Sequence, residues 1–161
     1  MKDLHDLCIR ALSDLNLKYT EDDGWITLLF THKNGTRRIE LATHKHFIQV
    51  QSWIAYAHIL PDKWDSVLEF IERVNATNAV AKLCIDFDDD TVGISAVNMF
   101  GEKLDRNDAK NIINYLIFDS LKLYNDCEEP LLKLITANNE CDPYSPITAF
   151  NDFEMLHDEE W

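Results

Sequence analysis

The sequence has few cations and no long apolar run. Its 15 Lys and Arg residues face 29 Asp and Glu residues among 161, giving a formal net charge of −14. Because proteins bind phosphate backbones and anionic lipids through clustered cations, this balance argues against nucleic acid and membrane surfaces as partners. No run approaches the ~20 apolar residues of a membrane span, and the opening MKDLHDLCIR lacks the apolar core of a signal peptide. We therefore expect a cytoplasmic protein.

Cysteine and glycine are also scarce, with four residues of each. Cys8, Cys84, Cys127 and Cys141 contain no CxxC pair, so we expect free thiols in a reducing compartment. Cys84, which lies among apolar neighbours, should be an inert small hydrophobe. The glycines, at positions 24, 35, 93 and 101, are too scattered to form a loop that cradles phosphate.

Catalytic and metal-binding patterns are missing or weak. No GxSxG marks a nucleophilic serine. His44 and His46 would face the same way on a strand, but two histidines without an identifiable third ligand favour a solvent-facing loop. Asp86, Asp88 and Asp90 alternate, yet they lack the glycine and glutamate of an EF-hand loop and fit a charged hairpin tip better. We expect no metal, no cofactor and no catalytic residue.

The clearest local pattern lies between residues 61 and 100. Apolar residues recur there at the spacing of a helix, namely Trp64, Val67, Leu68, Ile71 and Val74. Asp62 is the candidate N-cap, and Asn75 and Asn78 mark the helix exit. Apolar residues then alternate over 80–87 and 92–96 on either side of three aspartates, which predicts a β-hairpin whose first strand has Ala81, Leu83, Ile85 and Phe87 on one face.

The first third of the chain predicts a helix and three strands. Residues 2–16 carry an apolar stripe of leucines with Cys8 and Ala11, typical of a helix on an apolar surface. Residues 25–31 alternate, with apolar character on both faces, and Asn34-Gly35 then predicts a hairpin turn. The return strand covers 38–42. A third strand covers 47–58, with Ile48 and Val50 on one face and Phe47 and Trp53 on the other.

After the central hairpin the pattern is helical again. Asp105 is the candidate cap of a long helix, which is too apolar around residues 112–118 for a single narrow stripe. Pro130 is placed in the first turn of a further helix. The predicted order is α-βββ-α-ββ-α with that extra helix appended. It favours an α+β fold in which helices pack on an antiparallel sheet, formed by one domain over residues 1–137.

Residues 138–161 form an acidic, aromatic-containing C-terminal tail. Seven acidic residues and no Lys or Arg follow Leu134, and aromatic residues are interleaved with them. Either the tail packs its aromatics on its own domain, or it presents an acidic-aromatic motif to a partner or to a groove of the same chain. A set of basic residues is the expected counter-surface, namely His32, Lys33, Arg37, Arg38, His44, Lys45 and His46.

Several of these features resemble the YbjN family, which shares the fold of the type III secretion chaperones. They are the order of elements, Leu60-Pro61 before the central helix, the helix ending Phe70-Ile71-Glu72-Arg73-Val74-Asn75, and the hairpin from Ala81 to Met99 followed by a long apolar helix. The likeness covers about residues 4–136. It implies a small, acidic, frequently dimeric α+β domain that binds polypeptide and performs no reaction.

We therefore predict a non-enzymatic, chaperone-like or regulatory module that binds a polypeptide partner through apolar sheet or helix surface and forms a homodimer. An acidic immunity or antitoxin protein that neutralises a basic toxin is the alternative, because strong acidity steers binding to a basic partner. An enzyme of unrecognised type is the third possibility. Aromatic residues dominate protein contacts, and those expected to bind the partner are Phe47, Trp53, Tyr115, Phe118, Phe150, Phe153 and Trp161.

Overall fold

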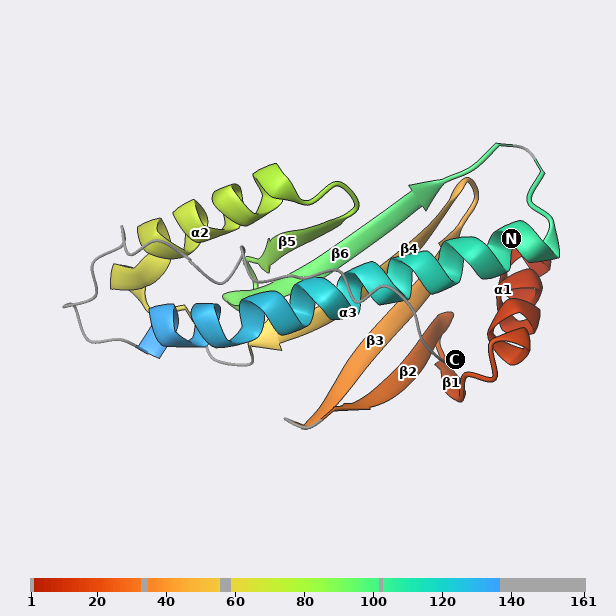
Figure 1. Ribbon diagram of the computed structural model, residues 1–161, viewed down its shortest axis with the longest axis horizontal. Helices are drawn as coiled ribbons and strands as arrows, with labels where there is room; N and C mark the ends of the chain where they lie inside the picture. Colours follow the sequence, from red (N-terminus) through yellow and green to blue (C-terminus); the bar gives the residue numbers. More distant parts are fainter. Residues whose placement is uncertain (1, 33–34, 56–58, 102, 137–161) are drawn as a thin grey trace, which may run out of the picture.

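The strands form one antiparallel sheet of six. The computed structural model describes residues 2–32, 35–55, 59–101 and 103–136. The sheet order is β1-β2-β3-β4-β6-β5, so the N-terminal meander joins the later hairpin through the β4 and β6 pair (Figure 1). The strands are β1 (Tyr19–Asp22), β2 (Trp25–His32), β3 (Gly35–His44), β4 (Phe47–Ala55), β5 (Ala81–Asp86) and β6 (Thr91–Met99).

Helices cover one face of this sheet. α1 (Lys2–Asp14) and α3 (Arg106–Thr136) pack on each other and on the middle strands, while α2 (Trp64–Thr77), preceded by the 3-10 turn η1 (Pro61–Lys63), lies along β5 beside α3 (Figure 1). α3 has 31 residues and is therefore ~46 Å long, enough to cross the whole sheet. No described helix combines the length and apolarity that crossing a bilayer requires.

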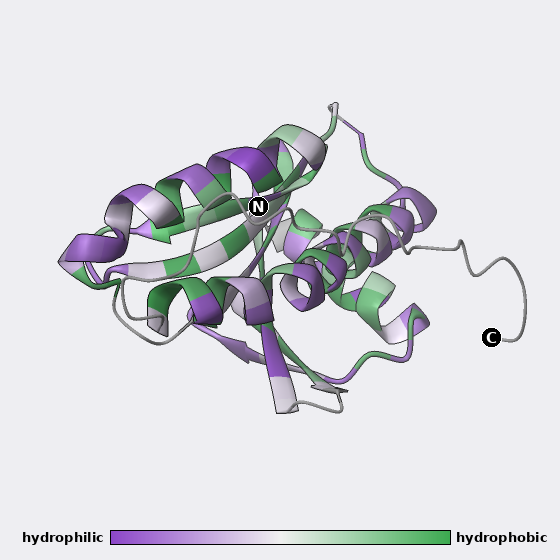
Figure 2. Cartoon of the chain, turned by 60° about the vertical axis from the view of Figure 1, so that its left-hand side comes forward, coloured by the Kyte–Doolittle hydropathy of each residue, from purple (hydrophilic) through white to green (hydrophobic). Residues whose placement is uncertain are grey.

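The strand register separates a core face from an outer face. Residues opposite each other in neighbouring strands point to the same side. The pairs Leu28 with Ile39 and Leu41 with Val50 are buried under the helices. The intervening residues of the same strands point to the other side, and hydrophobic and hydrophilic residues alternate along the strands in Figure 2. The core is thus a single layer between the sheet and three helices.

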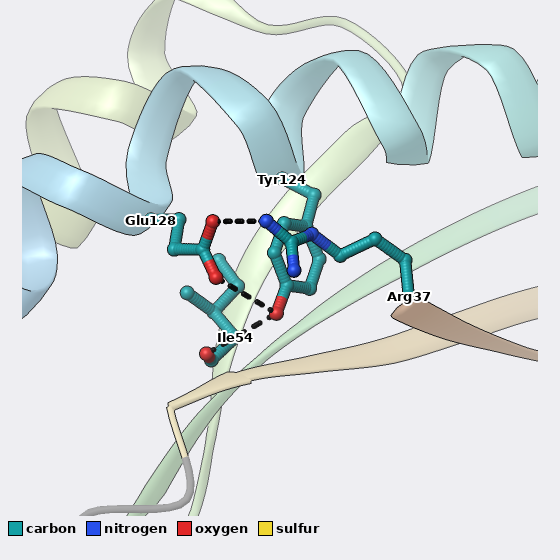
Figure 3. A network of polar contacts seen from close by, with 4 residues as sticks. All are labelled: Arg37, Ile54, Tyr124 and Glu128. Carbon is teal, nitrogen blue, oxygen red and sulfur yellow. Dashed lines mark hydrogen bonds and ion pairs between the residues drawn. The ribbon is translucent and has the colours of Figure 1, made fainter. Parts of the chain in front are cut away.

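A buried ion pair ties α3 to the sheet. Arg37 lies on the core face of β3 and is only 5% exposed. Its guanidinium pairs with Glu128 and lies over the Tyr124 ring, 4.5 Å from the ring centroid. The Tyr124 hydroxyl in turn donates to the Ile54 carbonyl oxygen at 3.4 Å (Figure 3). This network fixes the C-terminal half of α3 against β3 and β4.

The β5 edge of the sheet is closed by side chains. The Asn75 amide, at the end of α2, accepts a hydrogen bond from Leu83 N at 2.8 Å and donates one to Leu83 O at 2.9 Å. Asp119 of α3 accepts from Ala81 N at 2.8 Å. These contacts occupy backbone groups that a further strand would otherwise pair with. The asparagine that carried part of the family resemblance therefore has a definite structural role.

The predicted fold class is confirmed, since a six-stranded antiparallel sheet with helices packed on it is observed. The predicted cap Asp105 is confirmed as well, because its carboxylate accepts from Asp108 N at 2.8 Å. One strand, β1, was not predicted. β1 has four residues, of which three are exposed, so it carries no apolar alternation.

Three local predictions were wrong. Asp62 does not cap α2, because it lies in η1 and α2 begins at Trp64 without a side-chain cap. Pro130 does not begin a new helix but lies inside α3, where buried Leu131 and Ile135 keep the last turns packed on the core. Phe87 does not share the core face of β5. It lies in the turn, 73% exposed, and stacks on the Trp64 ring with centroids 5.8 Å apart.

Candidate functional site

The outer face of the sheet, opposite α1 and α3, carries exposed apolar side chains and is covered by no described helix. Three of its aliphatic side chains are strongly exposed: Leu29 of β2 at 65%, Val97 of β6 at 42% and Met99 of β6 at 77%. Scattered apolar side chains are normal on a protein surface, but a cluster on one face indicates an interaction site. The outer face is therefore the candidate functional site.

Its apolar residues gather near the two ends of β4. At one end, Phe47 lies directly opposite Met99, and Val97 follows two residues along β6. At the other end, Trp53 lies opposite Gly93, where a Cβ would stand 2.7 Å from the Trp53 ring. The glycine thus lets the indole lie flat across β6. Phe47 and Trp53 are six positions apart in β4, which is ~20 Å of strand.

A polar row crosses the sheet between these two ends. Glu40 pairs with Arg38 at 2.6 Å and accepts from the Gln51 amide at 3.0 Å. The Gln49 amide donates to Ser95 Oγ at 3.2 Å. The row therefore satisfies its hydrogen-bonding groups largely within the sheet, and it separates the Phe47 end from the Trp53 end.

Cations of the outer face are engaged, whereas two carboxylates are not ion-paired. Arg38 is bound to Glu40, and the Lys82 ammonium donates to the Asn78 carbonyl and, at 2.6 Å, to the Asn75 carbonyl at the end of α2. Asp22 of β1 and Asp86 of β5 lie on the same side at opposite edges of the sheet. Neither forms an ion pair with any residue that the structure describes. The face is thus apolar in patches, and its described charges sum to −1, since Asp22, Glu40 and Asp86 outnumber Arg38 and Lys82, whose ammonium keeps its charge because its partners are neutral carbonyls.

A second exposed apolar area lies on α3. Tyr115 is 49% exposed and Phe118 is 66% exposed. They are three residues apart and so lie on the same side of the helix. We call this pair the α3 ridge. The neighbouring Leu116 and Ile117 are buried, so the helix is neither sunk in the core nor polar on its outward side.

The positions predicted for partner binding fall into three groups. Phe47 and Trp53 lie on the outer face as predicted, and the Phe47 ring stacks on His44 with centroids 4.1 Å apart. Tyr115 and Phe118 form the α3 ridge. The remaining three lie outside the described residues, as does the whole predicted tail: Phe150, Phe153 and Trp161.

Those residues of the predicted basic counter-surface whose side chains the structure describes do not form one surface; Lys33 and the His32 side chain lie outside that part. Arg37 is buried in its pair with Glu128, and Arg38 is bound to Glu40. His44 stands at the other end of β3, seven residues or ~23 Å away from Arg37. Closeness in sequence was misleading because β3 runs the length of the sheet and places its two ends far apart.

Sequence reasoning did not single out Leu29, Val97 or Met99. The signal that could have found them was the apolar character on both faces of residues 25–31. A strand with one buried face needs apolar residues only on that face. An apolar residue on the other face therefore indicates a surface that binds a partner. In β6 the alternation predicted over 92–96 ends before Val97 and Met99, so it does not mark them.

Chemistry of other kinds has little support among the described residues. No group of three or more metal-binding side chains is found within them. Burial raises the pKa of Cys8 and of Cys127 to about 12, so both thiols are protonated at neutral pH. A protonated, buried thiol is a poor nucleophile and metal ligand.

Comparison with solved structures shows where this fold occurs. The crystal structure of YbjN from E. coli superposes with a TM-score of 0.59 at 13% sequence identity, covering 78% of this chain and 92% of YbjN. The chain has the YbjN fold. No protein-family model and no curated protein matches the sequence.

The YbjN fold also links the chain to secretion chaperones. A chain of the HopA1-SchA chaperone-effector complex matches with a TM-score of 0.55 at 13% identity, covering 77% of this chain and 91% of that one. A chain of the ExsC-ExsE complex matches with a TM-score of 0.53 at 11% identity, covering 85% and 97%. The predicted likeness to YbjN and the type III secretion chaperones is therefore confirmed at the level of the fold.

Proposed function

We propose that this protein is a non-enzymatic, chaperone-like module that binds a polypeptide partner on the outer face of its sheet. The observation that carries the proposal is the uncovered face itself, with Leu29, Val97 and Met99 exposed on it and the Trp53 ring lying across Gly93. When another apolar layer covers a sheet face of this kind, the free energy falls by about 25 cal/mol per Å² of apolar area buried. Two neighbours of the same fold, in the HopA1-SchA and ExsC-ExsE complexes, were solved with partners, which supports a polypeptide as the ligand.

We further propose that two copies associate through the α3 ridge. Tyr115 and Phe118 present two exposed aromatic rings on one turn, and aromatic anchors of this kind dominate interface energies. The helix carries four cations and five acidic residues, so its own charge is close to neutral in a chain of net charge −14. Two copies therefore meet there with less repulsion than over most of their surface.

Photo-crosslinking tests the first proposal. A photoreactive phenylalanine at position 29 places the label on the outer face, and the same label at Glu69, an exposed position of α2, is the matched control. In a lysate of its own organism, position 29 should crosslink to a single stoichiometric partner that position 69 does not reach. Absence of any crosslink from position 29, with only the protein itself recovered, would contradict the proposal.

Salt and chain length extend the test. An apolar contact should persist in high salt, whereas an immunity or antitoxin function, which charge alone supports, predicts steep loss of binding as salt rises. Capture with the full chain and with a chain cut after Asn138 shows whether the tail adds to binding or competes with it. Sedimentation of Tyr115→Ser with Phe118→Ser tests the homodimer, because this variant should be monomeric where the native protein is dimeric.

A further inference from the structure

The geometry of the outer face limits the secondary structure of a polypeptide segment that can cover it. Backbone N–H and C=O groups of a sheet lie in its plane and bond neighbouring strands, so they offer nothing to a segment lying on the face. Pairing at the β5 edge is blocked by Asn75 and Asp119. A segment that covers the face must therefore satisfy its own backbone, and a helix does so within itself.

The distance between the apolar residues near the two ends of β4 sets the length of that helix. Phe47 and Trp53 are ~20 Å apart along β4, which about 13 helical residues, or nearly four turns, would span. The polar row between them places Gln51 and Ser95 under the middle of such a helix. The side of the helix that faces the sheet should therefore be apolar at both ends and carry a hydrogen-bonding side chain near its centre.

Charge distinguishes between the possible occupants. The tail has seven acidic residues and no Lys or Arg, and it leaves 22 acidic and 15 basic residues, a net charge of −7, in the preceding chain. Placing the tail on this domain, or a second copy with its charge of −14 on the outer face, brings like charges together. A helix with Lys or Arg along its flanks is instead attracted by Asp22 and Asp86, which lie at the two margins of the face and which no described cation pairs.

We infer that the outer face receives a basic amphipathic helix of a partner protein, nearly four turns long, with its apolar stripe laid along β4 from Phe47 to Trp53. This inference rests on the proposed function and names the partner's chemistry. It also assigns the two apolar surfaces different ligands. The outer face binds the partner helix, and the α3 ridge binds a second copy of this chain.

Model peptides test the inference with the full-length protein. The probes are a helical Leu/Lys peptide of about 18 residues with one apolar stripe, a Leu/Glu peptide with the same stripe, and a Leu/Lys peptide of identical composition in alternating order. The methyl signals of the three methionines separate the possible sites, because Met99 lies on the outer face, Met1 at the N-terminus and Met155 in the tail. The helical Leu/Lys peptide should shift the Met99 signal at concentrations at which the other two peptides do not.

Paired variants measure the contribution of the face. Val97→Thr with Met99→Gln removes exposed apolar groups without adding charge, and it should weaken binding of the labelled Leu/Lys helix about tenfold. Leu68→Thr on α2, an exposed apolar position outside both the outer face and the α3 ridge, is the matched control and should leave the affinity unchanged to within about twofold. Asp22→Asn with Asp86→Asn should flatten the salt dependence of binding. Val97, Met99 and Asp22 are exposed and Asp86 is half-buried, and thermal unfolding checks that each variant folds.

Four outcomes would overturn the inference. They are equal binding of the Leu/Glu helix, binding without a Met99 shift, a Met99 shift when the chain is cut after Asn138, and a Met99 shift that grows with protein concentration alone. The last two would name the tail or a second copy as the occupant. Failure here is separable from failure of the proposed function, because a partner crosslinked at position 29 that is acidic or not helical would leave that function standing.

Discussion

Replacing Glu128 with Gln should destabilise the protein much more than the small change in shape suggests. The side chains of Arg37 and Glu128 are 6% and 22% exposed, so loss of the carboxylate charge leaves a guanidinium buried beneath α3 without its counter-charge. Arg37 Nε has no hydrogen-bond partner in the described part of the chain. Breaking a buried pair in this way costs about 3–5 kcal/mol, a large share of the roughly 5–15 kcal/mol that stabilises a domain.

Partial compensation comes from the Tyr124 ring, whose attraction for the guanidinium is worth about 0.5–2 kcal/mol. The expected net loss for Glu128→Gln is therefore about 2–4 kcal/mol. Arg37→Met should cost less, because the remaining Glu128 carboxylate is partly exposed and can reach water. The double variant Arg37→Met with Glu128→Leu should recover most of the stability, because an apolar pair of similar volume carries no desolvation penalty.

Urea unfolding followed by circular dichroism measures these differences, and the double-mutant cycle isolates the pair. Lys133→Met is the matched control on the same helix. It removes the Lys133 pair with Glu129, whose side chains are 74% and 77% exposed, and should leave the unfolding midpoint unchanged. If Glu128→Gln were no more destabilising than Lys133→Met, solvent would be screening the Arg37 pair, and the expected cost of leaving Arg37 buried without its counter-charge would be wrong.

Other parts of the fold yield further predictions. Asn75→Ala removes two hydrogen bonds from the β5 edge and should cost about 1–3 kcal/mol, with faster amide exchange in β5 and more aggregation; unchanged exchange would contradict its capping role. Gly93→Ala places a methyl group 2.7 Å from the Trp53 ring and should cost about 1–3 kcal/mol while changing tryptophan fluorescence, whereas a neutral substitution would show that the indole moves freely. Burial holds the pKa of Cys8 and Cys127 at about 12 against an ordinary 9.0, so the unfolded chain binds fewer thiol protons between pH 9 and 12. The free energy of unfolding should therefore fall as pH rises through this window, by up to about 1.4 kcal/mol per pH unit for each thiol, and Cys8→Ala should reduce that slope measurably in urea titrations.

Patterns that act within a few residues were predictable from the sequence. Helical spacing placed the central helix, alternation placed both faces of β4, and Asp105 marked the start of α3. Each of these depends on local backbone geometry and on which residues a core must bury. The outer-face position of Phe47 and Trp53 follows from the same alternation.

Features that depend on distant partners were not predictable. β1 is polar and exists because β2 offers it an edge, so no local signal marks it. Pro130 ordinarily disfavours a helix interior, but burial of Leu131 and Ile135 offsets that cost. Arg37 looked like a surface cation because its partner Glu128 lies 91 residues further along the chain. The uncovered outer face likewise became visible only when the positions of all three helices were known.

The position of α3 in the chain has a consequence for synthesis. This helix covers the core face of the sheet, yet it is made after every strand, since β6 ends at Met99 and α3 is complete only at Thr136. At a translation rate of about 5–20 residues per second, the finished strands wait roughly 2–7 s for it. During that interval the nascent chain presents apolar residues on both sides of its sheet. Folding on the ribosome therefore ends with the closing helix, because the core face of the sheet is covered only when α3 has been made.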